Sequence, residues 1–425
     1  MSMFARQLRL TGSNEVLVFF QTVSCTLLLT AASAYGAEPL KGIVLWPDMA
    51  RERPDLSAEV SLEFSYCLPC DVASEPGRYD WRKIEDLLTD IASRGHQAII
   101  RFRYVYPGEK LGGVRGATAV PKFIKNRGDY RETFAKNPDG DGPTWYPDWS
   151  CKALEDFTLD FYEAFAKKYD SDPRLAYVQA GFGHWAEYHT SGTKTKPGVN
   201  FPSIDFQRRF FALMEREFRK TPWMVSIDSA GRDGDWSPAV DLARHGVVFG
   251  LFDDSLMSRE HPKWNALNWS AFGEDHWKKA PRGGEISYYE KGDQRNFLSP
   301  KGVHGSTWAA TAKKFHLAFV IANDAPEGKY ATPERFAVAA HECGWRFVVK
   351  GWRVTQHGVE VMIGNEGVAP ICHDVGIAIG GKRGEGTLKG LLPGETRVFV
   401  VKDCASPKDV LTLVSEKLLF PVLLK

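Results

Sequence analysis

The fold of this chain is decided by the stretch Leu175-Ala-Tyr-Val-Gln-Ala-Gly-Phe-Gly-His-Trp-Ala-Glu-Tyr-His189. Residues 175–182 form an apolar run, which predicts a fully buried strand, and two glycines then allow the backbone to turn. The turn carries Trp185 and Glu187. The pattern therefore places an acid among aromatic rings at the end of a buried strand, which is a favourable position for a functional site.

Short apolar segments alternate with amphipathic ones from about residue 40 to 340, which predicts a parallel sheet with helical crossovers. Strands are expected at 42–46, 61–66, 97–104, 175–182, 223–228, 247–252, 284–288 and 316–322. Helices are expected at 81–93, 154–169, 205–220, 237–245 and 306–315. Eight strands in this alternation predict an α/β fold, a (β/α)8 TIM barrel over residues 38–340. The segment 47–60 is short and contains prolines, so it leaves little room for a regular first crossover helix.

A long segment between the third and fourth expected strands, residues 106–150, is rich in glycine and proline and contains Trp145, Tyr146 and Trp149. Long loops at the C-terminal face of a barrel usually build the binding cleft. We therefore expect this segment to shape the cleft.

The pattern changes after Gly344 to alternating apolar and polar residues with glycine-rich turns. Strands are expected at 345–354, 359–365, 375–379 and 396–401, which predicts a small antiparallel β-sandwich over residues 344–404. Residues 405–425 are expected to form a separate tail, of which 410–424 is apolar and helix-like.

The N-terminus has the pattern of a secretory signal. Arg6 and Arg9 precede an apolar stretch at 16–30, and the small residues Ala31-Ala-Ser-Ala34 follow. We expect a signal peptide over residues 1–37, because its apolar core is too short to span a membrane comfortably. The protein is then secreted or periplasmic, with no stable membrane insertion after cleavage. A buried first helix is the alternative reading.

Six cysteines remain after export: Cys67, Cys70, Cys151, Cys343, Cys372 and Cys404. An even number in an oxidising compartment favours disulfides, although the sequence does not give their pairing. The spacing of Cys67 and Cys70 also fits a redox or zinc motif, but no second such pair and no thioredoxin-like pattern accompany it.

Charge and composition exclude some classes of partner. The 54 Lys and Arg residues nearly balance the 53 Asp and Glu residues, which leaves no basic surface for nucleic acid. The aromatic share is 12%, and many of the 13 Trp lie in expected loops, which favours a carbohydrate substrate as partner. His184, His189 and His316 lack the spacing of a metal-ligand set, so no metal and no other cofactor are predicted.

Hydrolysis of a glycosidic bond needs two carboxyl groups, one protonated and one ionised. Glu285 is the expected partner of Glu187, because the ends of the fourth and seventh strands of a barrel face one central pocket. Asp254 and Asp228, which end the sixth and fifth strands, are rival partners. A separation of about 5 to 5.5 Å would predict retention of anomeric configuration, and one of about 6.5 to 9.5 Å would predict inversion.

Arg101 and Arg103 lie on the third expected strand. One of them is expected in the pocket beside the ionised carboxylate, and the other in a salt bridge at the strand end, with Glu63 as its natural partner. The sugar is expected to contact both arginines and a further set of side chains, namely Tyr104, Trp145, Trp149, His184, Trp185, Tyr188, His189, Asp254 and Tyr288.

Several of these motifs together resemble a known family: Phe64-Ser-Tyr66, Ile99-Ile-Arg-Phe-Arg-Tyr104, Val178 to His189, Phe252-Asp-Asp-Ser-Leu-Met257 and Gly283-Gly-Glu285. Their order resembles secreted bacterial barrels that are grouped as a domain of unknown function and are related to clan A glycoside hydrolases. The family's fourth-strand motif usually reads Gly-x-Trp-Gly-Glu-Trp-His, so Ala186 and Tyr188 replace a Gly and a Trp here. Asp253 stands where the family more often has Asn.

The C-terminal segments at 364–370 and 392–396 also look like the β-sandwich that follows these barrels, so the resemblance covers most of residues 60–402. It implies Glu187 as acid/base and Glu285 as nucleophile. We therefore expect an exported, retaining glycoside hydrolase acting on a poly- or oligosaccharide. The alternatives are a non-catalytic carbohydrate-binding or scaffold protein on the same barrel, and a secreted oxidoreductase using Cys67 and Cys70.

Overall fold

The structure, a computed structural model, describes residues 37–137, 140–231, 236–404 and 410–424. Eight parallel strands close into a barrel in the order β1-β14-β13-β12-β11-β10-β5-β2. These strands are β1 (Gly42–Leu45), β2 (Leu62–Cys67), β5 (Gln97–Phe102), β10 (Leu175–Ala180), β11 (Trp223–Ser226), β12 (Gly250–Leu256), β13 (Arg282–Ile286) and β14 (Phe319–Ile321). Each corresponds to one expected strand, which confirms the (β/α)8 barrel. Of the expected signal peptide at 1–37, residues 1–36 lie outside the described part of the chain.

The crossover helices mostly match their sequence patterns. They are α1 (Pro47–Glu52), α2 (Pro54–Ser57), α4 (Arg82–Ser93), α6 (Lys152–Tyr169), α7 (Ile204–Glu217), α8 (Ala239–Arg244), α9 (Asn265–Ala271), α11 (Trp308–Phe315) and α12 (Pro333–His341). The first crossover, where little room for a helix was expected, holds two short helices. Each begins with a proline, whose fixed φ suits the first helical turn and whose missing N–H costs nothing there. Short elements complete the connections: α3 (Pro69–Val72), β3 (Ala73–Glu75), β4 (Arg78–Tyr79), η2 (Ile227–Ala230), η3 (His276–Lys278), α10 (Asp293–Asn296) and η4 (Ala325–Glu327).

Strand β5 shows how alternation sorts the core into two layers. Ile100 and Phe102 point outward into the layer between strands and helices, where the Phe102 ring meets that of Phe161 on α6 at 4.8 Å. Ile99 points inward, with inward residues of the other strands. Arg101 has the same parity as Ile99 and is fully buried inside the barrel.

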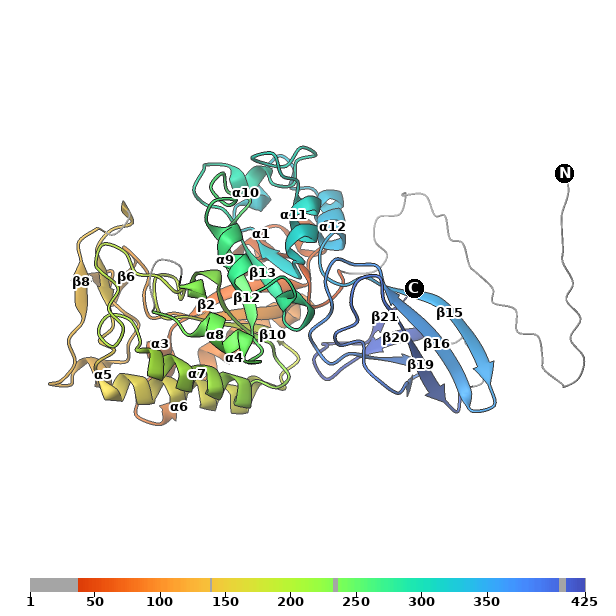
Figure 1. Cartoon of the computed structure of the whole chain (residues 1–425), viewed down its shortest axis with the longest axis horizontal. Coiled ribbons are helices and arrows are strands. Elements are labelled where there is room, and N and C mark those ends of the chain that lie inside the picture. The colour runs from red at the N-terminus through yellow and green to blue at the C-terminus, as the bar shows by residue number, and fades with distance from the viewer. Residues whose placement is uncertain (1–36, 138–139, 232–235, 405–409, 425) are drawn as a thin grey trace, which may run out of the picture.

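The long segment between β5 and α6 projects from the barrel at the far left of Figure 1. It forms two small antiparallel hairpins and one helical turn: β6 (Lys110–Leu111) with β7 (Val114–Arg115), α5 (Lys122–Lys125), and β8 (Thr133–Ala135) with β9 (Thr144–Tyr146). The segment therefore has secondary structure of its own beside the C-terminal ends of the strands.

The chain after the barrel forms two small antiparallel sheets, in the orders β15-β16-β19 and β18-β17-β20-β21. Their strands are β15 (Phe347–Thr355), β16 (Gly358–Asn365), β17 (Gly376–Ile379), β18 (Lys382–Arg383), β19 (Thr396–Lys402), β20 (Leu411–Val414) and β21 (Val422–Leu423). The expectation of a helix-like tail at 410–424 is wrong, because β20 pairs with β17 and β21 pairs with β20. Pro421 breaks any helix near residues 417–421, and the apolar side chains of β20 and β21 complete the second sheet.

The C-terminal sheets lie against the N-terminal ends of the barrel strands. His373 Nε2 donates to the carbonyl of Ala176 over 2.8 Å, and the Lys417 ammonium donates to the carbonyls of Asp170 and Asp172 just before β10. Apolar residues inside the barrel and residues of both sheets belong to one continuous buried cluster. The sheets thus close one end of the barrel and leave the C-terminal ends of its strands as the mouth. In the described part of the chain, no helix has both the length and the apolar character that crossing a membrane requires.

Candidate active site

Glu187 is carried by a tight loop that follows β10. The amide N–H groups of Phe182 and Gly183 both donate to the Glu187 carbonyl, over 3.1 and 2.8 Å, so the loop folds back on itself. Trp185 and Ala186 have φ of 50° and 59°, which is uncommon for residues with a side chain. A Cβ at Gly181 or Gly183 would come within 1.9 Å of a backbone oxygen, so this loop requires both glycines.

Arg101 joins the two predicted carboxylates inside the barrel. Its Nη2 lies 2.8 Å from Glu285 Oε1, and its Nη1 lies 3.6 Å from Glu187 Oε1. Its Nε donates to Gln179 Oε1 over 2.7 Å, and its guanidinium lies 4.1 Å from the centre of the Phe252 ring. Arg101 is therefore the arginine of β5 that lies beside both carboxylates, as expected.

Both carboxylates are withdrawn from water: Glu187 is 2% exposed and Glu285 is 6% exposed. Burial raises the pKa of Glu187 well above its ordinary value, the carboxylate of Asp254 raises it further, and Arg101 opposes the rise. Arg101 supplies the counter-charge closest to Glu285. Arg101 therefore contacts both acids and lies closer to Glu285 than to Glu187.

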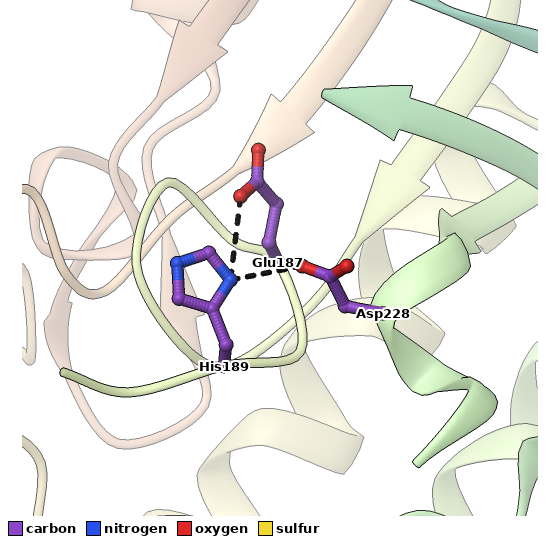
Figure 2. Close-up of side chains that lie close together, drawn as sticks. All are labelled: Glu187, His189 and Asp228. Atoms are coloured by element: carbon purple, nitrogen blue, oxygen red, sulfur yellow. Dashed lines mark hydrogen bonds and ion pairs between the residues drawn. The ribbon is translucent and has the colours of Figure 1, made fainter. Parts of the chain in front are cut away.

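His189 connects Glu187 with a third acid (Figure 2). Its Nδ1 lies 2.9 Å from Asp228 Oδ2 and 3.6 Å from Glu187 Oε2. Asp228 belongs to η2, directly after β11, and also receives Asn268 Nδ2 at 3.4 Å. The imidazole is therefore oriented by Asp228 and faces the carboxyl group of Glu187.

A cavity of about 340 Å³ opens beside this group. It is lined by Tyr188, His189, Asp228, Trp236, Asp254, Glu260, Trp264, Asn265, Asn268 and Tyr289. Burial raises the pKa of Asp254 to about 8, and the neighbouring carboxylates of Asp228 and Asp253 add to the rise. Asp253, in contrast, is buried and accepts hydrogen bonds from Asn265, Trp269 and His261, so it fixes the end of β12.

Four half-buried aromatic rings line the other side of the mouth. Trp46 follows β1, Tyr66 lies on β2, Tyr106 follows β5, and Trp185 follows β10. Successive ring centres are 5.8, 5.9 and 6.3 Å apart, in edge-to-face contacts. Of these four, only Trp185 is among the residues that the sequence predicts to bind the sugar. The inward parity of Tyr66 with Phe64, and the position of Trp46 directly after the first strand, were signals for two of the others.

Several expected sugar-binding residues lie elsewhere. Tyr104 is buried and its hydroxyl meets Thr158 Oγ1 of α6 at 2.9 Å, and Trp149 packs on Phe182 within the core. Trp145 lies on β9, where its ring meets that of Phe134 at 4.7 Å. Tyr104 and Trp149 belong to a core that extends into the 106–150 segment, whereas Trp145 packs on the exposed ring of Phe134 in the β8–β9 hairpin, so none of the three lines the cavity.

The remaining expected residues divide between core and surface. His184 is buried and stacks on Tyr146, whose hydroxyl it contacts, and burial lowers the pKa of His184 to about 3. Tyr188 is buried and lines the cavity, whereas Tyr288 is 50% exposed.

The expectation that Glu63 pairs with an arginine of β5 is wrong. Arg103 pairs with Glu109 over 2.6 Å. Glu63 instead binds Arg94 and His96 at the start of β5, each at 2.7 Å. Arg103 follows the last residue of β5 and lies at the rim of the barrel mouth. Glu63 lies on β2 and points outward, away from the barrel interior.

Among the described residues, five of the six cysteines expected in disulfides are not bridged. Cys67, Cys70, Cys151, Cys343 and Cys372 are unbridged thiols. Burial raises the pKa of Cys67 to about 12 and that of Cys70 to about 11, which is opposite to the shift that a redox-active thiol requires. Cys67 belongs to the core and Cys70 is partly buried on α3, and the raised pKa of both thiols argues against the oxidoreductase alternative.

Two groups of side chains in the described residues bring three possible metal ligands within 4.8 Å of one another: Glu187, His189 and Asp228, and separately Glu290, Asp293 and His304. In the first group, a direct contact of 2.9 Å already joins His189 to Asp228. A cation there would have to replace that contact and would also engage the carboxyl group of Glu187.

No family model and no curated protein sequence matches this chain. Among solved structures, it is similar to the catalytic domain of a β-amylase from Paenibacillus polymyxa, at 11% identity and a TM-score of 0.45, covering 71% of this chain and 98% of that one. It is also similar to xylanase B from Clostridium stercorarium F9, at 11% identity and a TM-score of 0.42, covering 70% and 96%. A GH30 endoxylanase from Clostridium papyrosolvens C71 is similar at 9% identity and a TM-score of 0.41, covering 90% and 95%. Likenesses of this strength do not assign an activity to the chain.

Proposed function

We propose that this protein is an exported glycoside hydrolase that cleaves a poly- or oligosaccharide with retention of anomeric configuration. The observation that carries the proposal is the shared contact of Glu187 and Glu285 with Arg101. Glu187 comes from the fourth barrel strand's loop and Glu285 from the seventh strand, so two carboxyl groups converge at the mouth of the barrel. Half-buried aromatic rings beside them offer surfaces on which a sugar can stack.

The proposed reaction has two steps. In the first, the Glu285 carboxylate attacks the anomeric carbon, the bond from this carbon to the leaving oxygen breaks, and Glu187 gives its proton to that oxygen. In the second, a water molecule attacks the same carbon, Glu187 takes the water's proton, and Glu285 leaves. The raised pKa of Glu187 supports its role as the acid, because the group must hold a proton at the start.

Retention is supported by the way one guanidinium spans both acids. Contact with one guanidinium holds the two carboxyl groups close to each other. A spacing of about 5 to 5.5 Å is the one found in retaining enzymes, whereas inverting enzymes need about 6.5 to 9.5 Å to admit a water molecule. A non-catalytic carbohydrate-binding protein is the alternative, but it would have no need of two buried acids on one arginine.

The test is a panel of polysaccharides and aryl glycosides assayed with wild type, Glu187→Gln and Glu285→Gln. Loss of general acid catalysis should lower turnover by about 10²- to 10⁴-fold for poor leaving groups and far less for activated ones. Glu285→Gln should abolish turnover of both. Glu163→Gln, on the solvent face of α6, is the matched control, because Glu163 pairs only with Lys167 at the surface.

If Glu187→Gln or Glu285→Gln kept the activity of the wild type, the assignment of these two residues as the catalytic carboxyl groups would be refuted. Proton NMR of the first-formed sugar anomer decides between retention and inversion. Assays with and without a chelator show whether a cation at Glu187 and His189 takes part.

A further inference from the structure

The cavity beside Glu187 has an unusual charge balance. Three of its lining residues are acids, Asp228, Asp254 and Glu260, and none is a lysine or arginine. Glu260 is already paired with Lys263 at 2.8 Å. Among the described residues, no lysine or arginine forms an ion pair with Asp228 or Asp254. The cavity at the opposite, closed end of the barrel differs, since Arg219, Lys220, Lys279 and Lys389 line it.

Asp254 is only weakly satisfied by the protein. It receives Asn265 Nδ2 at 3.2 Å and Ser255 Oγ at 3.4 Å, which are long contacts from neutral groups. Burial raises its pKa to about 8, and the neighbouring carboxylates of Asp228 and Asp253 add to that rise. A cation in the cavity would relieve the crowding of these carboxylates.

Two further observations indicate that the cavity receives a ligand. The Oε2 atom of Glu187 is buried and accepts no hydrogen bond from the described residues, yet it faces His189, which lines the cavity. Two aromatic side chains of the lining are largely exposed, Trp264 at 58% and Tyr289 at 71%. Exposed rings at the rim of a cavity are suited to stack on a sugar, and their faces also attract cations.

We propose that this cavity binds a sugar unit that carries a free amino group, with its ammonium between Asp228 and Asp254. The protein is thus directed to substrates containing amino sugars, and it discriminates against uronic acids, whose carboxylates the cavity repels. Trp264 and Tyr289 stack on the sugar, and the ammonium donates to the two carboxylates. This inference rests on the proposed function in that it treats the cavity as part of the sugar-binding cleft.

The test measures binding apart from turnover. Full-length Glu187→Gln is titrated by calorimetry with matched sugars in the gluco and galacto series, as single units and as oligomers. Within each set the members differ at one carbon only, which bears an amine, an acetamide or a hydroxyl group. The amine member should bind at least about tenfold more tightly than the other two, because a charged hydrogen bond contributes more than a neutral one. Its affinity should fall as salt is raised, and that of the neutral members should not.

Asp254→Asn, made in the same background, should remove most of the preference for the amine, because it should weaken binding of the amine member far more than binding of the hydroxyl member. Asp86→Asn, at an exposed position on α4, is the control and should change neither affinity. If no amino sugar binds, or if a neutral member binds as well as the amine, the inference is refuted. Hydrolysis of neutral glycosides that depends on Glu187 would still support the proposed function in that case. Conversely, binding of amino sugars without hydrolysis of any of them would refute the proposed function alone.

Discussion

Arg101 and Glu285 meet inside the barrel with 2.8 Å between Nη2 and Oε1, although they lie on the third and seventh strands. Both side chains are buried, so neither charge is compensated by water. The same guanidinium contacts Glu187 and Gln179. Arg101 therefore links the two acids and supplies the positive charge that lies between them.

Replacement of Arg101 tests this relationship. Arg101→Met should destabilise the protein by about 3 to 5 kcal/mol, because it leaves a buried carboxylate without its partner. Arg101→Lys keeps the charge but cannot reach both acids at once, so it should retain more stability and still lose activity. Urea unfolding and kcat/KM measure the two effects. Arg103→Lys, at the rim, is the control; activity in Arg101→Lys equal to that of Arg103→Lys would contradict the assignment.

The pH dependence of activity should follow Glu187. The acid form is needed, and burial raises its pKa, so activity is present below that pKa and is lost as the pH rises through it. An activated aryl glycoside, whose leaving group needs little protonation, should show this alkaline limb weakly. Profiles of kcat/KM for both substrates check the prediction, and identical alkaline limbs would exclude Glu187 as the acid.

Stability should reveal the same raised pKa without any substrate. In the unfolded chain Glu187 ionises near its ordinary value of about 4.3, whereas in the folded protein it keeps its proton to higher pH. The stabilisation that protonated Glu187 gives is complete below about pH 4. It is lost as the pH rises toward the pKa that Glu187 has in the folded protein. The Tm of Glu187→Gln relative to wild type should thus increase between about pH 4 and pH 8. A difference that does not change with pH would indicate an ordinary pKa.

The thiols of Cys67 and Cys70 should be inert in the native protein. Burial raises the pKa of both, to about 12 and about 11, so little thiolate exists at neutral pH. Labelling by a thiol reagent should be slow until a denaturant is added, when both should react readily. Rapid labelling of the folded protein, or exchange with a small disulfide, would restore the oxidoreductase alternative.

Lys417 should make stability increase with pH in the alkaline range. Its ammonium donates to two carbonyls and to Thr221 Oγ1, and burial lowers its pKa to about 8. Between about pH 8 and pH 10.4 the unfolded chain binds more protons at this residue than the folded one, so stability increases with pH there. Lys417→Met should reduce that slope and lower stability at pH 7, because the carbonyls lose their donor. Unfolding by urea at several pH values measures the pH dependence of the free energy of unfolding. The same dependence in Lys417→Met and wild type would contradict the burial of the Lys417 charge.

The barrel was predictable because its signals are local. Each strand is a short apolar run, and each lies where periodicity placed it, including the one before the proline-rich first crossover. Glu187 was predictable for the same reason, since an acid after a buried strand and two glycines can be read from one stretch.

The aromatic and acidic surroundings of the site were harder to predict. Trp149 and Tyr104 resemble cleft residues in sequence but belong to a core that extends into the long segment. Asp228 approaches Glu187 through His189 only after β10 and β11 have paired. The tail was misjudged because an apolar run with a proline does not by itself distinguish a strand from a helix. The positions of these residues and the structure of the tail depend on contacts between segments that are distant in the sequence.

The C-terminal sheets cover the end of the barrel opposite the mouth, where His373 and Lys417 bind the starts of the strands. This arrangement has a practical consequence for immobilisation. If the protein is attached to a surface through its C-terminal sheets, the mouth faces the bulk solution, and a large polymer can approach it unhindered. Attachment through the hairpins of the 106–150 segment would turn the mouth toward the support instead.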